Sequence, residues 1–322
     1  MRQRLVLIGG SGFIGQSLLR FLKQGGFWKK FQTIIFDPRA PEFFKPDQYI
    51  KAGIEETEKI RRILKKGDIL IHLVHTTIPA DSAETPEREF KENLEPSIKL
   101  IEMLREKSCP RIAGLVYFSS GGTIYGEAKK QKPIPEDAER MPGSFYALVK
   151  LIIEDLLMMA GRLGWLNYLI IRPGNPFGPY QELLNRHGVV GKIFQAMIAG
   201  EKFVIYGKGE TIRDYIYIDD LIQGLLVLIE KQKWNQVFNI GSGKGTSLKD
   251  LISLCEKVSG KKLRKKFQPI RKTDLKYNVL DCARLKALGW KPKIQLEQGL
   301  SETWRYFLDC AQAGAPAERT RK

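Results

Sequence analysis

The glycine-rich segment Gly9-Gly10-Ser11-Gly12-Phe13-Ile14-Gly15 constrains the fold of this chain more than any other feature. It follows an apolar run at residues 5–8 and opens an amphipathic segment at residues 13–23. Glycines at these spacings permit a tight turn, close approach of the backbone to a ligand, and close packing of a helix on a strand. The N–H groups and dipole at the start of that helix favour a pyrophosphate. The pattern therefore predicts a dinucleotide-binding unit.

Short apolar runs alternate with amphipathic segments through the first half of the chain. The apolar runs scarcely alternate with polar residues, as expected for parallel strands that are buried on both faces. The expected strands span residues 5–8, 33–37, 68–74, 112–118 and 166–172, and the expected helices span residues 13–23, 56–64, 93–107 and 146–163. Repeated right-handed βαβ units predict an α/β fold with a doubly wound parallel sheet of the Rossmann type.

After Pro173 the alternation loosens. Residues 174–178 indicate a Pro/Gly-rich turn, and residues 181–188 indicate a polar loop. Further helices are expected at 189–199, 219–230 and 247–259, and short strands at 203–206 and 237–240. We therefore expect an NAD-binding Rossmann domain over residues 1–173 and a smaller, mixed substrate-binding lobe mainly over residues 174–310, with some segments returning to the first domain. Residues 311–322 are expected to form a disordered tail.

Asp37 ends the second expected strand. A carboxylate at this position accepts hydrogen bonds from the adenosine ribose and repels a 2′-phosphate, which favours NAD over NADP. Arg39 would suit a 2′-phosphate, but Asp37 holds the end of the strand.

Tyr146 and Lys150 are four residues apart in an expected helix, so their side chains lie on one face. A nearby ammonium and a positive nicotinamide ring both favour the phenolate. Such a tyrosine can accept a hydroxyl proton while a hydride leaves the same carbon. Residues 118–126 follow a buried strand at its carboxyl end, where α/β sheets bind ligands, and they supply further hydroxyls.

These features resemble the extended short-chain dehydrogenase/reductase superfamily, in the NAD-dependent epimerase/dehydratase group typified by UDP-glucose 4-epimerase. The matching motifs are spread over nearly the whole chain. They are the glycine motif, Asp37, Ile71-His72-Leu73, Asn93, Ser119-Ser120 with Tyr125-Gly126, Tyr146 with Lys150, residues 172–179, residues 213–220, Phe238-Asn239-Ile240-Gly241, and Arg271 with Asp274.

The resemblance implies a role for each matching residue. Tyr146 is implied as the base, Lys150 as the residue that orients the nicotinamide ribose, and Thr123 as a third catalytic residue. The implied cofactor residues are Gly9, Gly12, Phe13, Ile14, Gly15, Asp37, Leu73, Tyr146 and Lys150. The implied substrate residues are Ser120, Asn175 at the sugar–phosphate, Arg213 and Arg271 at the diphosphate, and Asp274 near the nucleoside.

The chain departs from the family pattern at two places. The family's catalytic Ser or Thr, four residues before the Tyr of the Tyr-Gly pair, is Gly121 here. Thr123, or with less support Ser120, must then supply the hydroxyl, or the third member of the triad is absent. The dehydratase subgroup carries an Asp-Glu pair where this chain has Gly122-Thr123, which argues against 4,6-dehydration.

The resemblance implies C4 epimerisation of a nucleotide sugar, most simply a UDP-hexose, through a 4-keto intermediate by a cytoplasmic homodimer. One alternative is a reductase or epimerase of a 4-keto-deoxysugar nucleotide. An alternative of another class is a catalytically weak, NAD-bound regulatory or RNA-binding relative, which Tyr146 and Lys150 argue against.

Composition narrows the possible partners. The net charge of +17 is compatible with a plain basic surface, with attraction of anionic substrates, or with nucleic-acid binding. The densest basic cluster, residues 261–266, has no interleaved aromatic side chain, which argues against single-strand binding. The four cysteines show no CxxC pattern and only three histidines occur, so we expect reduced thiols and no metal. No apolar stretch has membrane-spanning length.

Overall fold

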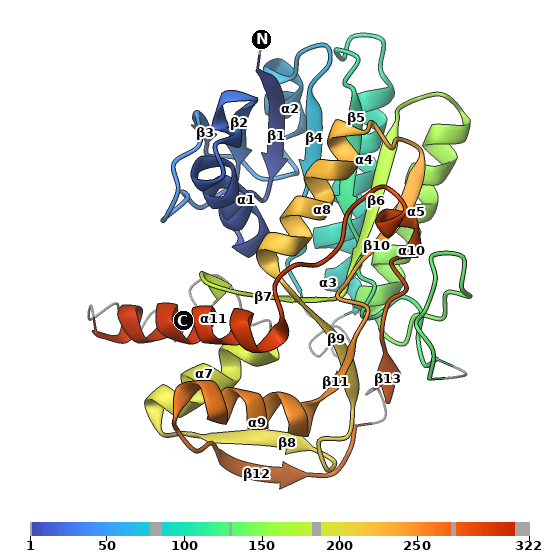
Figure 1. Cartoon of the computed structure of the whole chain (residues 1–322). Helices are drawn as coiled ribbons and strands as arrows, with labels where there is room; N and C mark the ends of the chain where they lie inside the picture. Colours follow the sequence, from blue (N-terminus) through green and yellow to red (C-terminus); the bar gives the residue numbers. More distant parts are fainter. Residues whose placement is uncertain (1, 78–85, 129–130, 182–187, 272–274, 313–322) are drawn as a thin grey trace.

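The computed structural model describes residues 2–77, 86–128, 131–181, 188–271 and 275–312 (Figure 1). A seven-stranded sheet organises the larger part, with strand order β10-β6-β5-β4-β1-β2-β3 and every pair parallel. Its strands are β1 (Gln3–Ile8), β2 (Phe31–Phe36), β3 (Gln48–Ile50), β4 (Ile69–His72), β5 (Gly114–Phe118), β6 (Tyr168–Pro173) and β10 (Gln236–Ile240). The expected doubly wound parallel sheet is confirmed.

Helices cover both faces of this sheet because its strands are apolar on both sides. Leu5 and Leu7 of β1 pack in one buried cluster with residues of α1 (Phe13–Gln24) and α8 (Ile218–Glu230). Val6 and Ile8 pack in a second cluster with α2 (Thr57–Ile63), α4 (Glu95–Arg105) and α5 (Phe145–Arg162). Figure 1 shows α1 and α8 over the same face of the sheet. The minor helices here are η1 (Phe27–Lys29), α3 (Pro86–Glu89), η2 (Phe90–Leu94) and α10 (Ala283–Lys286).

The remaining elements form a smaller lobe with its own core. β7 (Asn175–Phe177), β9 (Ile212–Tyr217), β11 (Gly245–Ser247) and β13 (Tyr277–Asn278) form a four-stranded sheet, and β8 (Lys202–Tyr206) pairs with β12 (Arg264–Gln268). α7 (Val189–Ala199), α9 (Leu248–Ser259) and α11 (Leu296–Gln312) pack together around Phe194, Leu251 and Phe307. The chain returns from this lobe to the large sheet through α8 and β10. The division at residue 173 stays a prediction.

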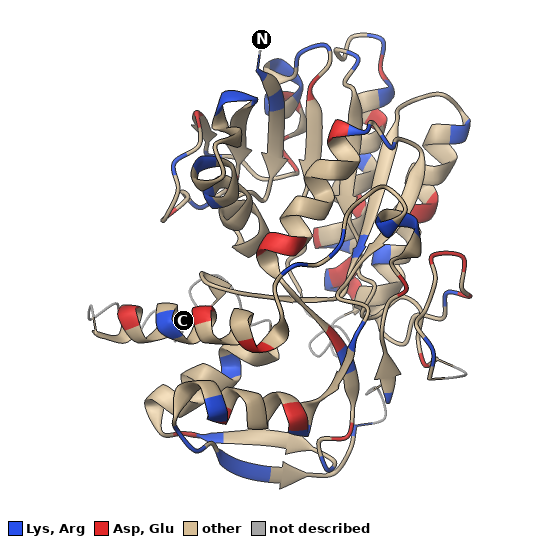
Figure 2. Ribbon diagram, in the orientation of Figure 1, with Lys and Arg blue, Asp and Glu red and all other residues tan. Residues whose placement is uncertain are grey.

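Two local expectations were wrong, and one basic segment adopts a structure that was not predicted from the sequence. Residues 174–178, expected as a turn, contain β7, because the backbone of Asn175–Phe177 pairs with Tyr215–Tyr217 of β9. The basic segment 261–266 contributes to β12, whose first four residues are exposed and whose ribbon lies at the outer edge of the smaller lobe in Figure 2. Ala311 and Gln312, assigned to the tail, continue α11, while residues 313–322 lie outside the described residues. Most of the expected loop at 181–188 also lies outside the described residues.

Candidate active site

A cleft of about 960 Å³ opens where β1, β4, β5 and β6 end, between the large sheet and the smaller lobe. It brings together most residues that the sequence identifies. Its lining includes Gly9, Gly12, Phe13, Ile14, Gly15, Leu73, Ser120, Thr123, Tyr146, Lys150, Asn175, Arg213 and Arg271. Asp37 lies beside the glycine turn and is not part of this lining. Asp274 lies outside the described residues.

The glycine turn is shaped to hold a pyrophosphate. Gly9 has a φ of +79°, and a side chain on Gly15 would meet the carbonyl oxygen of Gly10 at 2.2 Å, so both positions require glycine. A Cβ on Gly12 would meet only the Gly9 oxygen, at 3.5 Å, and would fill the space in front of α1. No side chain caps α1. Its first N–H groups can therefore bind an anion, and the residues present fit a dinucleotide.

Asp37 closes this turn from the adjacent strand end. Its two carboxylate oxygens accept hydrogen bonds from the backbone N–H groups of Ser11 (3.1 Å) and Arg39 (2.9 Å). A carboxylate has further lone pairs that can accept ribose hydroxyls. The Arg39 side chain is exposed, whereas Asp37 is buried. The geometry is compatible with a ribose-binding role for Asp37.

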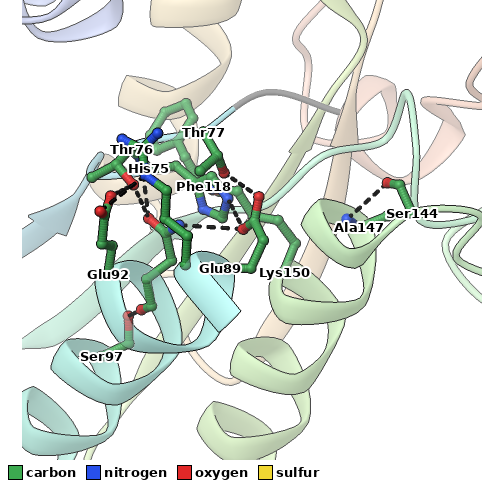
Figure 3. Close-up of polar contacts among 12 residues, drawn as sticks. His75, Thr76, Thr77, Glu89, Glu92, Ser97, Phe118, Ser144, Ala147 and Lys150 are labelled. Atoms are coloured by element: carbon green, nitrogen blue, oxygen red, sulfur yellow. Dashed lines mark hydrogen bonds and ion pairs between the residues drawn. The ribbon is translucent and has the colours of Figure 1, made fainter. Parts of the chain in front are cut away.

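Tyr146 and Lys150 enter the cleft from the first turns of α5. Ser144 begins this helix, because its side-chain oxygen accepts the N–H of Ala147 at 3.2 Å. Lys150 Nζ donates to the carbonyl oxygen of Phe118 at 2.7 Å and lies 5.9 Å from the centre of the Tyr146 ring. The first contact fixes α5, the helix that carries both residues, to the end of β5 (Phe118 and Lys150 in Figure 3).

Burial controls the ionisation of both groups. It lowers the pKa of Lys150 to about 7, although the carboxylates of Glu89 and Glu154 act in the opposite direction. Burial and, after it, the charge of Glu89 raise the pKa of Tyr146 to about 12, although a hydrogen bond to Ser120 acts in the opposite direction. The protein alone therefore holds a neutral phenol and a lysine that is close to half-protonated at neutral pH.

The structure brings Ser120, rather than Thr123, to the Tyr146 hydroxyl. Thr123 Oγ1 lines the cleft but is buried with no hydrogen-bond partner among the described residues. Gly121 faces packed structure: a Cβ there would meet Leu280 at 2.6 Å and the Pro173 carbonyl oxygen at 2.9 Å. A serine at position 121 would not reach the cleft without movement of its neighbours. The catalytic role of Thr123 stays a prediction that this geometry does not favour.

Two residues that the sequence did not identify lie near Tyr146, one packed on its ring and the other bound to the first. The His75 ring packs edge to face on the Tyr146 ring, with centroids 4.4 Å apart. His75 Nε2 lies 3.1 Å from a carboxylate oxygen of Glu89, which is fully buried (Figure 3). His75 follows β4 at the edge of the sheet where α/β folds bind ligands, so its position in the sequence could have identified it as a candidate site residue. Glu89 lies among many charged residues and gives no such signal.

The far end of the cleft carries the expected diphosphate-binding residues. Arg213 lies on β9, and one of its terminal nitrogens donates to the carbonyl oxygen of Ile212 at 2.9 Å. The Arg271 guanidinium lies 4.2 Å from the centre of the Tyr206 ring. Asn175, on β7, donates to the carbonyl oxygen of Asp214 at 3.2 Å. Two arginines at one end of a cleft suit bidentate recognition of a diphosphate.

The described residues contain neither a metal-binding cluster nor a membrane-spanning helix. No group of three or more His, Cys, Asp or Glu side chains there is arranged to hold a metal ion. No helix among those residues has both the length and the apolar character needed to cross a membrane.

Comparison with known proteins gives matches over nearly the whole chain. The pattern of the NAD dependent epimerase/dehydratase family matches residues 5–241. The dTDP-4-dehydro-6-deoxyglucose reductase of Escherichia coli is 30% identical, over 92% of this chain and 95% of its own length. The structure of UDP-glucose 4-epimerase from Thermotoga maritima with UDP-glucose has a TM-score of 0.86 at 33% identity, covering 96% of this chain and 100% of that one. The UDP-glucose 4-epimerase of Thermus thermophilus, in complex with NAD, has a TM-score of 0.82 at 25% identity, covering 98% of this chain and 100% of that one.

Proposed function

Because the chain belongs to the NAD-dependent epimerase/dehydratase family, we propose that it interconverts the C4 epimers of a UDP-hexose. The observation that carries this proposal is the arrangement of one cleft, with the glycine turn at one end, Arg213 and Arg271 at the other, and Tyr146 and Lys150 between them. A nucleotide sugar anchored by its diphosphate would place its hexose beside Tyr146.

In the proposed mechanism Tyr146 moves one proton. Its phenolate takes the proton of the C4 hydroxyl while a hydride leaves C4, so that a 4-keto sugar forms, and Tyr146 returns that proton when hydride return rebuilds the hydroxyl. Bound NAD supplies the hydride acceptor and donor at C4 and a positive ring that favours the phenolate. In its protonated form Lys150 adds a second positive charge beside Tyr146, and Ser120 holds the phenol by a hydrogen bond.

The substrate end of the cleft keeps the nucleotide fixed while the sugar turns. We assign this end to Arg213, Arg271 and Asn175, with Asp274 at the nucleoside, and the glycine turn, Asp37 and Leu73 to the cofactor. The pyranose ring must expose first one face and then the other to the cofactor for C4 to invert. A firm hold on the diphosphate with fewer contacts to the sugar is suited to that motion.

We expect Ser120→Ala to reduce kcat more than Thr123→Val does. Ser120 contributes a hydrogen bond to a group that becomes charged, and such bonds are worth about 1.5–3 kcal/mol, or roughly 10- to 100-fold in rate. Thr123 lines the cleft, but its hydroxyl has no hydrogen-bond partner among the described residues. Steady-state kinetics of the two variants decide between them, and a larger loss for Thr123→Val would restore the assignment drawn from the sequence.

A second candidate function is reduction of a 4-keto-6-deoxysugar nucleotide, which the identity to the Escherichia coli reductase favours. The two functions differ in their use of the cofactor. We expect UDP-glucose and UDP-galactose to reach the same equilibrium mixture from either side without net change in NADH absorbance. A reductase would instead consume NADH stoichiometrically with a dTDP-4-keto-6-deoxyhexose and would leave the UDP-hexoses unchanged.

We also propose that the protein is a cytoplasmic homodimer. Support for pairing comes from the apolar side chains of Phe145 and Met159, which are exposed on α5, and of Leu163, which is exposed at its end. Support for a reducing compartment comes from Cys109, Cys255 and Cys282, which are free thiols buried in the structure. Sedimentation analysis of the purified protein tests the pairing, since a monomer at working concentration would contradict it.

A further inference from the structure

His75 and Glu89 form a buried pair beside Tyr146 that the proposed mechanism does not use. His75 Nε2 lies 3.1 Å from Glu89 Oε2, and the imidazole ring touches the Tyr146 ring edge to face. Figure 3 shows His75 and Thr77 converging on Glu89 from the segment after β4, with Lys150 approaching from α5. The pair is therefore in direct contact with the residue that handles the proton.

Glu89 is held as a buried anion. Its side chain is 0% exposed, and it accepts hydrogen bonds from His75, from Thr77, and from Asn93 Nδ2 at 3.2 Å. Burial opposes its ionisation, but these hydrogen bonds outweigh burial and lower the pKa of Glu89. A carboxylate in this position needs a compensating charge, because an unpaired buried anion is costly. A proton on His75 would supply that charge at hydrogen-bond distance.

The helix that carries Glu89 is shaped to hold this arrangement. α3, η2 and α4 run without a break from residue 86 to residue 105, and η2 is a π-helical turn placed between Glu89 and Asn93. The Asn93 amide donates to Glu89 and accepts the backbone N–H of Thr76 at 2.9 Å, which fixes the segment that presents His75. Such wide turns inside α-helices recur at functional sites.

The surrounding charges make this pair relevant to the phenol. After burial, Glu89 is the main group that raises the pKa of Tyr146, and it opposes the effect of burial on the pKa of Lys150. Other ionisable groups near the pair within the described residues include Glu92 on η2, which Thr76 binds, Tyr117 on β5, which lies under Lys150, and His72 on β4. Burial lowers the pKa of His72 to about 3, and the charges of Lys150 and His75 act in the same direction. His72 is therefore neutral at working pH.

We propose that His75 is a positioning residue whose proton, retained by Glu89, cancels the charge of that carboxylate and so permits Tyr146 to ionise. This proposal rests on the proposed function only in taking Tyr146 as the base. With His75 protonated, the pair presents no net charge to the phenol. When His75 loses its proton, a buried anion faces Tyr146 and the phenol keeps its hydrogen. The two groups therefore titrate as a coupled pair.

His75→Gln tests the charge without removing the contact to Glu89, because the glutamine amide can still donate to that carboxylate. The ionisation of Tyr146 is read from the phenolate absorbance of the NAD-bound protein, with Tyr146→Phe as the blank. We expect the midpoint to move upward by about 1 pH unit or more in His75→Gln, as for an uncompensated charge within a few ångströms.

The double variant His75→Gln/Glu89→Gln separates charge from packing. It removes both charges, so the pair is again neutral and the midpoint is expected to return close to that of the wild type. Glu89→Gln alone is also expected to stay near the wild type. A midpoint that does not move in His75→Gln, or an upward shift that persists in the double variant, would overturn the proposal.

A titration of the unaltered protein provides a test that does not depend on the folding of any variant. The chain contains only three histidines, so the imidazole signals can be followed individually by NMR. We expect His75 to hold its proton above the ordinary histidine value of about 6.5, and to lose it at lower pH in Glu89→Gln. Titration of wild-type His75 at or below the ordinary value would refute the proposal. This measurement needs no substrate, so its failure is distinguishable from failure of the epimerase assay.

Discussion

Replacing Tyr146 with phenylalanine is expected to lower kcat by about 10²- to 10⁴-fold, the usual consequence of losing a general base. The substitution removes only the hydroxyl, and the ring that packs on His75 stays in place. The glycine turn is untouched, so NAD affinity should change by no more than a few-fold. Steady-state assays on UDP-glucose and UDP-galactose, with NAD titration by fluorescence, measure both quantities.

Tyr168→Phe is the matched control, because it removes the hydroxyl of a buried tyrosine at the start of β6, the end of that strand away from the cleft. It should leave kcat near the wild-type value. If Tyr146→Phe retained more than about a tenth of wild-type kcat, which is a barrier change of under 1.4 kcal/mol, Tyr146 could not be the base.

Arg213→Ala is expected to raise KM for the nucleotide sugar by about 30-fold to several thousand-fold, equivalent to roughly 2–5 kcal/mol. A diphosphate oxygen enclosed in the cleft would lose its charged partner, and Arg271, which lies over the Tyr206 ring, occupies a different position. The rate at saturation should fall much less, because Arg213 does not take part in the proton transfer assigned to Tyr146. A large rise in KM with little change in kcat is therefore the result that identifies a substrate-binding role for Arg213.

Arg213→Lys and Arg111→Ala complete this comparison. Lysine keeps the charge but loses the bidentate fork, so an intermediate KM is expected. Arg111 is an exposed arginine before β5, away from the cleft, and its removal should change neither constant. An unchanged KM in Arg213→Ala would show that Arg213 does not bind the diphosphate.

The first half of the fold could be predicted from sequence because its signals are local. A buried parallel strand requires a run of apolar residues, and β1, β2 and β4 to β6 all show one. The glycine motif then specifies the turn between β1 and α1, since Gly9 and Gly15 have no room for a side chain. The residues around the cofactor cleft could be predicted as well, because they come directly after these strands in the sequence.

The smaller lobe was harder to predict because its strands depend on distant partners. β7 includes a proline and only three residues, and it becomes a strand through pairing with β9. β12 is nearly all exposed and basic, so its sequence resembles a solvated loop, and its backbone is ordered by pairing with β8 (Figure 2). Neither pairing leaves a periodic hydrophobic pattern in the strand itself.

The contacts around Tyr146 could also be predicted only in part from the sequence. Tyr146 and Lys150 share one helix face, so their proximity was predictable. His75 and Glu89 meet across the segment after β4 and the π-helical turn, which no spacing rule encodes. The choice between Ser120 and Thr123 likewise depends on side-chain direction at the end of β5, which only the structure provides.

The central claim, epimerisation at C4 by removal and return of the same hydrogen, is tested most directly by an isotope label. The protein is incubated with NAD and UDP-galactose that carries deuterium at C4, in ordinary water, and the UDP-glucose formed is analysed by NMR. We expect UDP-glucose that retains deuterium at C4, with no net accumulation of NADH. Loss of the label to solvent, or failure to convert the UDP-hexose at all, would contradict the account.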